Sequence, residues 1–204
     1  MFTFTAAVVP VRSDLVAAFR AEWDGLARPG AVLTSSDRVG LARTARSGRF
    51  GTLADPLEKL ARKLYAEPGA VVESDVRNAA DATSDAHAVE AIGIVSRLAA
   101  VDGFHRAMQL ELEPLPEPID GAPTGEIDTT LQRRRTHVPV APGPIPYTLN
   151  HVPAEGRALK AIHGPQYMSY DEMDDARFAR KPGLNRAQME LVSSMVSIHN
   201  QCFY

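Results

Sequence analysis

The sequence predicts an all-α protein, and three features point to that class. Apolar residues recur at spacings of three and four, alanine is abundant, and no alternating β-branched run is flanked by hairpin turns. Spacings of three and four mark one face of a helix, whereas a half-buried strand alternates with period two. Alanine also has the highest helix propensity of all residues. We therefore expect helices joined by turns rich in glycine and proline.

Five helices are predicted in the first half of the chain, each bounded by a capping residue or a helix breaker. Ser, Asp and Asn side chains accept hydrogen bonds from the first backbone N–H groups of a helix, while Pro or Gly ends it. Pro56 suits a first helical position, where its missing N–H does no harm. The buried face of the fifth helix is expected to include Val89, Ile92, Val95 and Ala99. The five helices should cover roughly residues 15–28, 37–48, 55–67, 73–82 and 85–112.

The composition changes between Pro114 and Pro153, where nine of the fifteen prolines fall. Proline removes a backbone donor and fixes φ, so a continuous helix cannot form there. The stretch is either a disordered tether or an extended arm laid across a neighbouring surface, and its length is typical of a domain boundary. The expected division is a helical domain over 1–112, a Pro-rich linker or arm over 113–149, and a second helical region over 150–204.

Three more helices are predicted after the Pro-rich stretch, with Ser169 and Asn185 as the caps of the last two. They should cover roughly residues 154–164, 172–180 and 185–199. Glu190 lies at the edge of an apolar stripe on the last helix. We expect that stripe to be buried, and it consists of Met189, Val192, Met195 and Ile198.

Charge and hydropathy restrict the class of function. The net charge is −3 and no stripe of Lys and Arg occurs, so nucleic acid is not an expected partner. The one basic cluster, Arg133-Arg134-Arg135, is expected to be solvated loop charge. The N-terminus has no basic region followed by the apolar run of a signal peptide, and no stretch approaches the ~20 apolar residues of a membrane span. We expect a cytoplasmic protein without membrane contact.

No metal or cofactor is predicted. None of the six histidines has a second histidine four residues away, the spacing of a helical metal pair. Glu172, Asp174 and Asp175 are explained by the helix dipole, because acidic residues are favourable in a first turn. The sequence also has no glycine-rich phosphate loop and no serine-elbow motif.

The segment LNRAQMELVSSMVSIHNQCFY is the most informative part of the chain. It holds the single cysteine, Cys202, twelve residues after Glu190. A lone cysteine is usually a small buried apolar residue. An unbroken helix would hold the two residues about 18 Å apart, so the chain must reverse between them if they exchange protons. Asn200 suits a left-handed cap at such a reversal, and Cys202 would then begin a new helix whose dipole lowers the pKa of a thiol.

This segment resembles the signature of the AhpD-like family, which includes alkylhydroperoxidases and carboxymuconolactone decarboxylases. In that family a glutamate precedes by twelve residues the first cysteine of a Cys-x-x-Cys pair, and a histidine follows four residues after the second. Ser197 and Asn200 also occupy family-like positions between Glu190 and Cys202. The approach from Ile145 onward is similar to the peroxidase-related branch of the family.

The resemblance implies a peroxidase-type, antioxidant oxidoreductase that acts on peroxides without a bound cofactor. In the family the second thiol attacks the peroxide, the first resolves the sulfenate as a disulfide, and a dithiol protein re-reduces the pair. By position, Cys202 is the resolving residue and Glu190 the proton-relay carboxylate. His199, Asn200 and Ser197 are candidate supporting residues, although the sequence favours a turn or core role for His199. A homo-oligomer is also implied.

The pattern departs from the family at its second redox residue, which belongs at position 205, one past Tyr204. The chain as given is therefore expected to have little or no peroxidase turnover. It is either a fragment or frameshifted product, or position 205 is a selenocysteine, as in some family members, whose codon was read as a stop. Two other functions stay open: a non-catalytic all-α interaction or assembly protein, and a decarboxylase-like acid/base enzyme of the same superfamily.

An internal echo links the two halves of the chain. When Glu90 is aligned with Glu190, Asp102 falls opposite Cys202 and His105 falls where the missing residue would be. This alignment predicts a degenerate AhpD-like pseudo-domain in the first half, with Glu90 and His105 as relics or packing residues. The other explanation is the chance alignment of two amphipathic helices that share a glutamate.

Overall fold

The computed structural model describes residues 2–49, 51–53, 55–143, 147–179 and 184–199. Over these ranges all regular elements are helical, namely eight α-helices and one short 3-10 helix, and no strand occurs among them. The all-α prediction is confirmed. The chain divides into two compact units, Met1–Pro165 and Gln166–Tyr204. We call them the body and the C-terminal unit.

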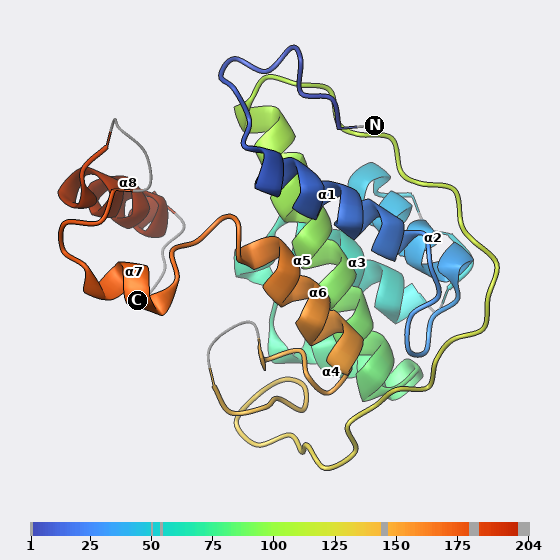
Figure 1. Ribbon diagram of the computed structural model, residues 1–204. Helices are drawn as coiled ribbons and strands as arrows, with labels where there is room; N and C mark the ends of the chain where they lie inside the picture. The colour runs from blue at the N-terminus through green and yellow to red at the C-terminus, as the bar shows by residue number, and fades with distance from the viewer. Residues whose placement is uncertain (1, 50, 54, 144–146, 180–183, 200–204) are drawn as a thin grey trace. The chain divides into compact units, whose positions relative to one another are not determined.

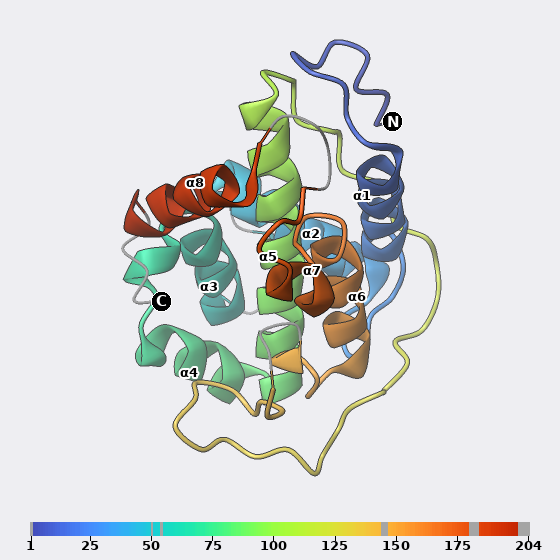
Figure 2. The same ribbon diagram turned by 60° about the vertical axis from the view of Figure 1, so that its left-hand side comes forward.

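The body is built around one long central helix, α5. In Figure 2, α3 and α4 lie on one side of α5 and α1 and α6 on the other, and α2 also packs against α5. The helices of the body are α1 (Ser13–Leu26), α2 (Ser35–Ser47), α3 (Asp55–Ala66), η1 (Pro68–Ala70), α4 (Glu73–Ala82), α5 (Asp85–Ala107) and α6 (Pro153–His163).

Local capping explains most of these boundaries. Thr34 precedes α2 and accepts a hydrogen bond from the Asp37 N–H at 3.2 Å, and the Asp37 carboxylate accepts one from the Thr34 N–H. Ser84 caps α5, because its side chain accepts from the His87 N–H. That helix ends at Ala107 instead of near residue 112, because Gln109 has a left-handed φ of 56°. The Leu110 N–H then bonds the His105 carbonyl at 2.9 Å, which closes the helix.

The core of the body is apolar and includes a group of aromatic rings. Val89 and Val95 on α5 are buried as predicted, whereas Ile92 and Ala99 are only partly buried. Near the N-terminus, Phe2 packs edge-on against Trp23 at a centroid distance of 5.2 Å. Further rings complete this group, those of Phe4, Phe19, Phe104 and His105.

The described part of the Pro-rich stretch is an arm that lies along the body, not a tether. The Trp23 Nε1–H donates to the Pro114 carbonyl at 2.7 Å, and the Ile119 N–H donates to the Ala27 carbonyl at 2.7 Å. Farther along, Arg133 forms an ion pair with Asp85. The expectation of a fully solvated basic cluster is therefore wrong for Arg133, although Arg134 and Arg135 are exposed. Figure 1 shows the arm in yellow-green along the edge of the body.

The boundary expected at residue 150 differs from the observed one. Helix α6 packs against α1 and α5, so it belongs to the body, which continues to Pro165. The physical reason is Glu155 on α6, which is 2% exposed and is held by two arginines of the body. Because both partners of this buried charge belong to the body, α6 packs as part of it.

The C-terminal unit contains α7 (Tyr170–Asp174) and α8 (Arg186–His199). Ser169 and Asn185 cap these helices as predicted. Helix α7 ends at Asp174, well short of the expected residue 180. The prediction of a buried stripe on α8 is wrong, because no described residue of this helix is buried. The described partner within the unit is only five residues long, too short to cover a helix of fourteen residues.

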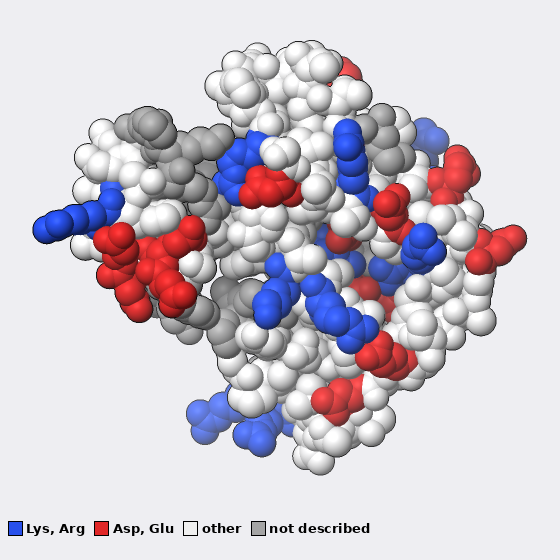
Figure 3. All heavy atoms as spheres, viewed as in Figure 1, with Lys and Arg blue, Asp and Glu red and all other residues white. Residues whose placement is uncertain are grey.

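On the face of the body seen in Figure 3, basic and acidic side chains are interspersed, and neither charge predominates. Across the described residues, no helix combines the length and the apolar character that crossing a membrane requires.

Candidate functional site

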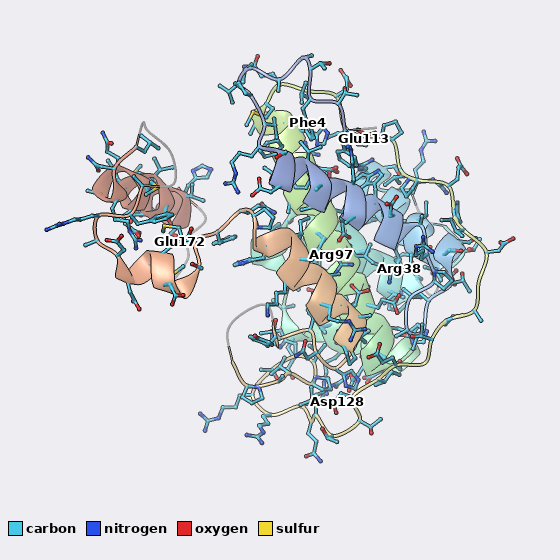
Figure 4. The ribbon with its side chains drawn as sticks, in the orientation of Figure 1. Phe4, Arg38, Arg97, Glu113, Asp128 and Glu172 are labelled. Atoms are coloured by element: carbon cyan, nitrogen blue, oxygen red, sulfur yellow. The ribbon has the colours of Figure 1, made fainter. Side chains whose placement is uncertain are left out.

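Glu190 lies on α8 and is held by a neighbouring arginine. Its Oε1 accepts from Arg186 Nη2 at 2.6 Å, and its side chain is 50% exposed. The other guanidinium nitrogen of Arg186 donates to the Glu172 carbonyl of α7 at 3.3 Å and approaches the Met168 sulfur at 3.4 Å. Arg186 therefore ties the Glu190 carboxylate of α8 to the α7 segment (Figure 4 labels Glu172).

Helix α8 has a polar strip and an apolar face on opposite sides. At 3.6 residues per turn, Glu190 and Ser197 lie seven residues apart and within about 20° of each other around the axis, with Arg186 beside them. The opposite face carries large apolar side chains that are all between 56% and 68% exposed: Leu191, Val192, Met195, Val196 and Ile198.

The predicted site residues fall into two groups. Glu190 and Ser197 share the polar strip, whereas His199 is exposed and lies about half a turn away, so it points to the other side of α8. Asn200 and Cys202 lie outside the described residues. The close approach of Glu190 and Cys202 stays a prediction.

A second group of charged residues, of which only Glu90 stood out in the sequence, lies inside the body. Two arginines and three glutamates from four helices form one buried network, which we call the ionic cluster. None of these side chains is more than 7% exposed. Arg38 and Arg97 are labelled in Figure 4. The members are Glu22 of α1, Arg38 of α2, Glu90 and Arg97 of α5, and Glu155 of α6.

Glu155 is the centre of the ionic cluster. Its Oε1 accepts from Arg38 Nη1 at 2.9 Å and its Oε2 from Arg97 Nη1 at 2.6 Å. Arg97 Nε donates to Glu22 Oε1 at 2.7 Å. Arg38 also pairs with Glu90. The result is a continuous chain of charges that joins α1, α2, α5 and α6.

Glu90 is held by the backbone as well as by Arg38. Its Oε2 accepts from the Val32 N–H at 3.0 Å and the Leu33 N–H at 3.4 Å. Two glycines leave space for the carboxylates, because a Cβ on Gly30 would overlap Glu90 and a Cβ on Gly93 would overlap Glu155. The cluster therefore depends on the absence of a side chain at both positions.

The carboxyl groups of the cluster differ in their electrostatic surroundings. Burial raises the pKa of Glu22 more than Arg97 lowers it. Burial also opposes ionisation of Glu155, but Arg97 and Arg38 together hold the pKa of that carboxyl below its usual range. Arg97 is also fully buried, which by itself lowers the pKa of its guanidinium, but the neighbouring glutamates raise that pKa.

A smaller polar group lies near the C-terminal end of α5. The buried Asp102 accepts two hydrogen bonds from Arg46, at 2.8 and 2.5 Å, and one from the Tyr65 hydroxyl at 2.5 Å. Arg106 donates to the same hydroxyl at 2.6 Å. Burial and the neighbouring Asp102 raise the pKa of Tyr65.

This group borders an open groove of about 770 Å³ between the ends of α2 and α3. Basic side chains predominate in its lining, but Arg46, Lys59 and Lys63 each pair with a carboxylate. The C-terminal ends of α2 and α3 each contribute about half a negative charge as well. The groove therefore has little uncompensated positive charge to attract an anion.

The residues of the internal echo serve packing and ion pairing in the body. Glu90 and Asp102 lie on one continuous helix, α5, and take part in two separate groups. The chain does not reverse between them, as the site at Glu190 and Cys202 would require. His105 is buried and packs on Phe4 at a centroid distance of 5.2 Å.

The ionic cluster had one signal in the sequence. Glu90 and Arg97 lie seven residues apart on one side of α5, in a mostly apolar stretch of that helix, which indicates that both lie in the core. Their partners could not be identified in this way, because Arg38 and Glu155 are 117 residues apart.

The described residues contain no group of three or more His, Cys, Asp or Glu side chains that could hold a metal ion. No family model matches the chain, and no curated protein and no solved structure matches it either.

Proposed function

We propose that the chain is a peroxidase-type oxidoreductase whose chemistry resides in the C-terminal unit, at Glu190 and Cys202. The observation that carries the proposal is the separation of twelve residues between a helical glutamate and the single cysteine, in a segment that resembles the AhpD-like signature. Glu190 is half exposed on the polar strip of α8, and this accessibility supports a role in proton transfer.

In the proposed reaction a thiolate or selenolate at position 205 attacks a peroxide oxygen, and the O–O bond breaks. The peroxide leaves as an alcohol or water, and the attacking group becomes a sulfenic or selenenic acid. The Cys202 thiol condenses with this acid, which releases water and forms a disulfide or selenylsulfide. A dithiol protein then reduces that bond and is itself oxidised to a disulfide. Glu190 exchanges the protons of these steps.

The exposed apolar face of α8 supports an assembled form of the protein. Side chains such as Leu191 and Ile198 are more than half exposed in the single chain. A contiguous apolar surface of this kind is typical of an interface. The homo-oligomer that the resemblance implies would cover it.

The proposal is tested with a chain extended through position 209, which carries cysteine or selenocysteine at 205 and histidine at 209. Dithiol-dependent peroxide consumption is compared among this chain, its Cys202→Ser variant and the 204-residue chain. We expect turnover only in the extended chain with Cys202 intact. The proposal fails if the extended chain consumes peroxide no faster than its Cys202→Ser variant.

A second candidate function is that of a non-catalytic all-α interaction or assembly protein. The exposed apolar face of α8 also favours this function, because an interaction protein needs such a surface and no redox residue. The extended chain tells the two candidates apart, since an assembly protein forms its oligomer without gaining peroxide turnover.

A further inference from the structure

We propose that the ionic cluster is a proton-binding site, occupied at neutral pH by one proton on Glu22, and that loss of this proton weakens the docking of α6 onto α1 and α5. The proposal concerns the body alone and does not depend on the redox function proposed above.

The charge count of the cluster requires a proton. Three carboxylates face two guanidinium groups, and all five side chains are nearly inaccessible to water. If every group were ionised, one negative charge would stay uncompensated in the core. An unpaired buried charge is unfavourable enough that such a group changes its protonation state instead.

The hydrogen bonds indicate which carboxyl group holds the proton. Glu155 accepts from both guanidinium groups, and Glu90 accepts from Arg38 and from two backbone N–H groups. Among the described residues, Glu22 accepts only from Arg97 Nε, at 2.7 Å. A carboxylate with fewer donors is stabilised less in its charged form, so Glu22 is the member that binds the proton.

The groups facing Glu22 are Arg97 from α5, Glu155 from α6 and Arg38 from α2. Arg97 is already shared with Glu155, at 2.6 Å. Deprotonation of Glu22 therefore places a second negative charge on a guanidinium that also holds Glu155, and the two carboxylates repel each other. This repulsion acts between α1 and α6 and reduces the affinity of α6 for the rest of the body.

The sign of the pH dependence follows from this arrangement. Burial raises the pKa of Glu22 in the folded body. The stability that its proton provides is complete below the pKa of the unfolded chain and is lost as the pH rises through the folded value. Between these two pH values the folded state holds one proton more than the unfolded state. That difference increases the unfolding equilibrium constant about tenfold per pH unit.

The test is urea unfolding of the full chain between pH 5 and 9, with Glu22→Gln as the main variant. The amide has the shape of the protonated acid and cannot ionise, so we expect near wild-type stability at pH 5 and loss of the one-proton slope. Asp24→Asn, an exposed change on the same helix, should keep the slope. Glu155→Gln leaves two carboxylates facing two guanidinium groups, so Glu22 can ionise in the folded state and this variant should also lose the slope.

Infrared spectroscopy gives a readout that a purely structural role would not change. At neutral pH the wild-type chain should show the C=O stretch of a protonated, buried carboxyl group, and Glu22→Gln should lack it. The proposal is overturned if Glu22→Gln retains the wild-type pH slope, or if the wild-type chain has no such band.

Discussion

A methyl group added at Gly93 tests the packing of the ionic cluster directly. In Gly93→Ala the new Cβ would overlap Glu155 Oε2 and stand 3.0 Å from Arg97 Nη1. Both neighbours are buried, and the bond between them is 2.6 Å long. We expect Glu155 to move away from the new methyl group and so to withdraw from Arg97.

The size of the effect follows from two opposing terms. Breaking a buried ion pair costs about 3–5 kcal/mol, because a charge is left in the core without its partner. Alanine favours the helix over glycine by about 1 kcal/mol. We therefore expect Gly93→Ala to lose about 2–4 kcal/mol of unfolding free energy. For a chain of this size, that corresponds to a fall in Tm of roughly 4–16 °C.

The assay is urea unfolding followed by the fluorescence of Trp23, the single tryptophan, which is fully buried in α1 of the body. Gly103→Ala is a matched control on the same helix, because a Cβ there has no neighbour within 4 Å. This control should gain roughly 0.5–1 kcal/mol from helix propensity alone. If both variants stabilise the body equally, the packing described around Gly93 is wrong.

Two further predictions concern the body. Tyr65→Phe removes one donor to Asp102 and should cost about 1 kcal/mol near neutral pH. Because the pKa of Tyr65 is raised in the folded state, the stability linked to its proton is lost as the pH rises above about 10. Unfolding curves measured over a series of pH values should show this loss for the wild-type chain and not for Tyr65→Phe. Trp23→Phe removes the hydrogen bond to the Pro114 carbonyl and should lower the free energy of unfolding by at least about 1 kcal/mol. The measurement is urea unfolding followed by circular dichroism. A variant as stable as the wild-type chain would show that the arm is not held at Trp23.

The helices were predictable wherever their limits are set by neighbouring residues. Glu73–Ala82 was predicted at its observed limits. The cap at Asn185 was also predicted, because the Gln188 N–H that it accepts is three residues away. The end of α5 was not predictable, since Gln109 adopts a left-handed conformation that is unusual without glycine.

Features that depend on distant contacts could not be predicted. The unit to which α6 belongs is decided by Glu155, whose partners Arg38 and Arg97 are 117 and 58 residues away. The exposure of α8 also depends on distant contacts. Its apolar spacing is that of a buried helix, but the spacing does not tell whether another surface covers that face. Of the candidate site, the position of Glu190 and Ser197 on one strip follows from helix geometry alone.

The proposal that Glu190 and Cys202 share a site is tested most directly by the reactivity of the thiol. The rate of alkylation of Cys202 is measured against pH in the 204-residue chain and in its Glu190→Gln variant, with Asp171→Asn as an exposed control in the same unit. A carboxylate about 4 Å from a thiol disfavours the thiolate by about 1 kcal/mol in a water-like medium. We expect Glu190→Gln to move the alkylation midpoint down by roughly 0.5–1 pH unit. Identical midpoints in all three chains would contradict the proposal.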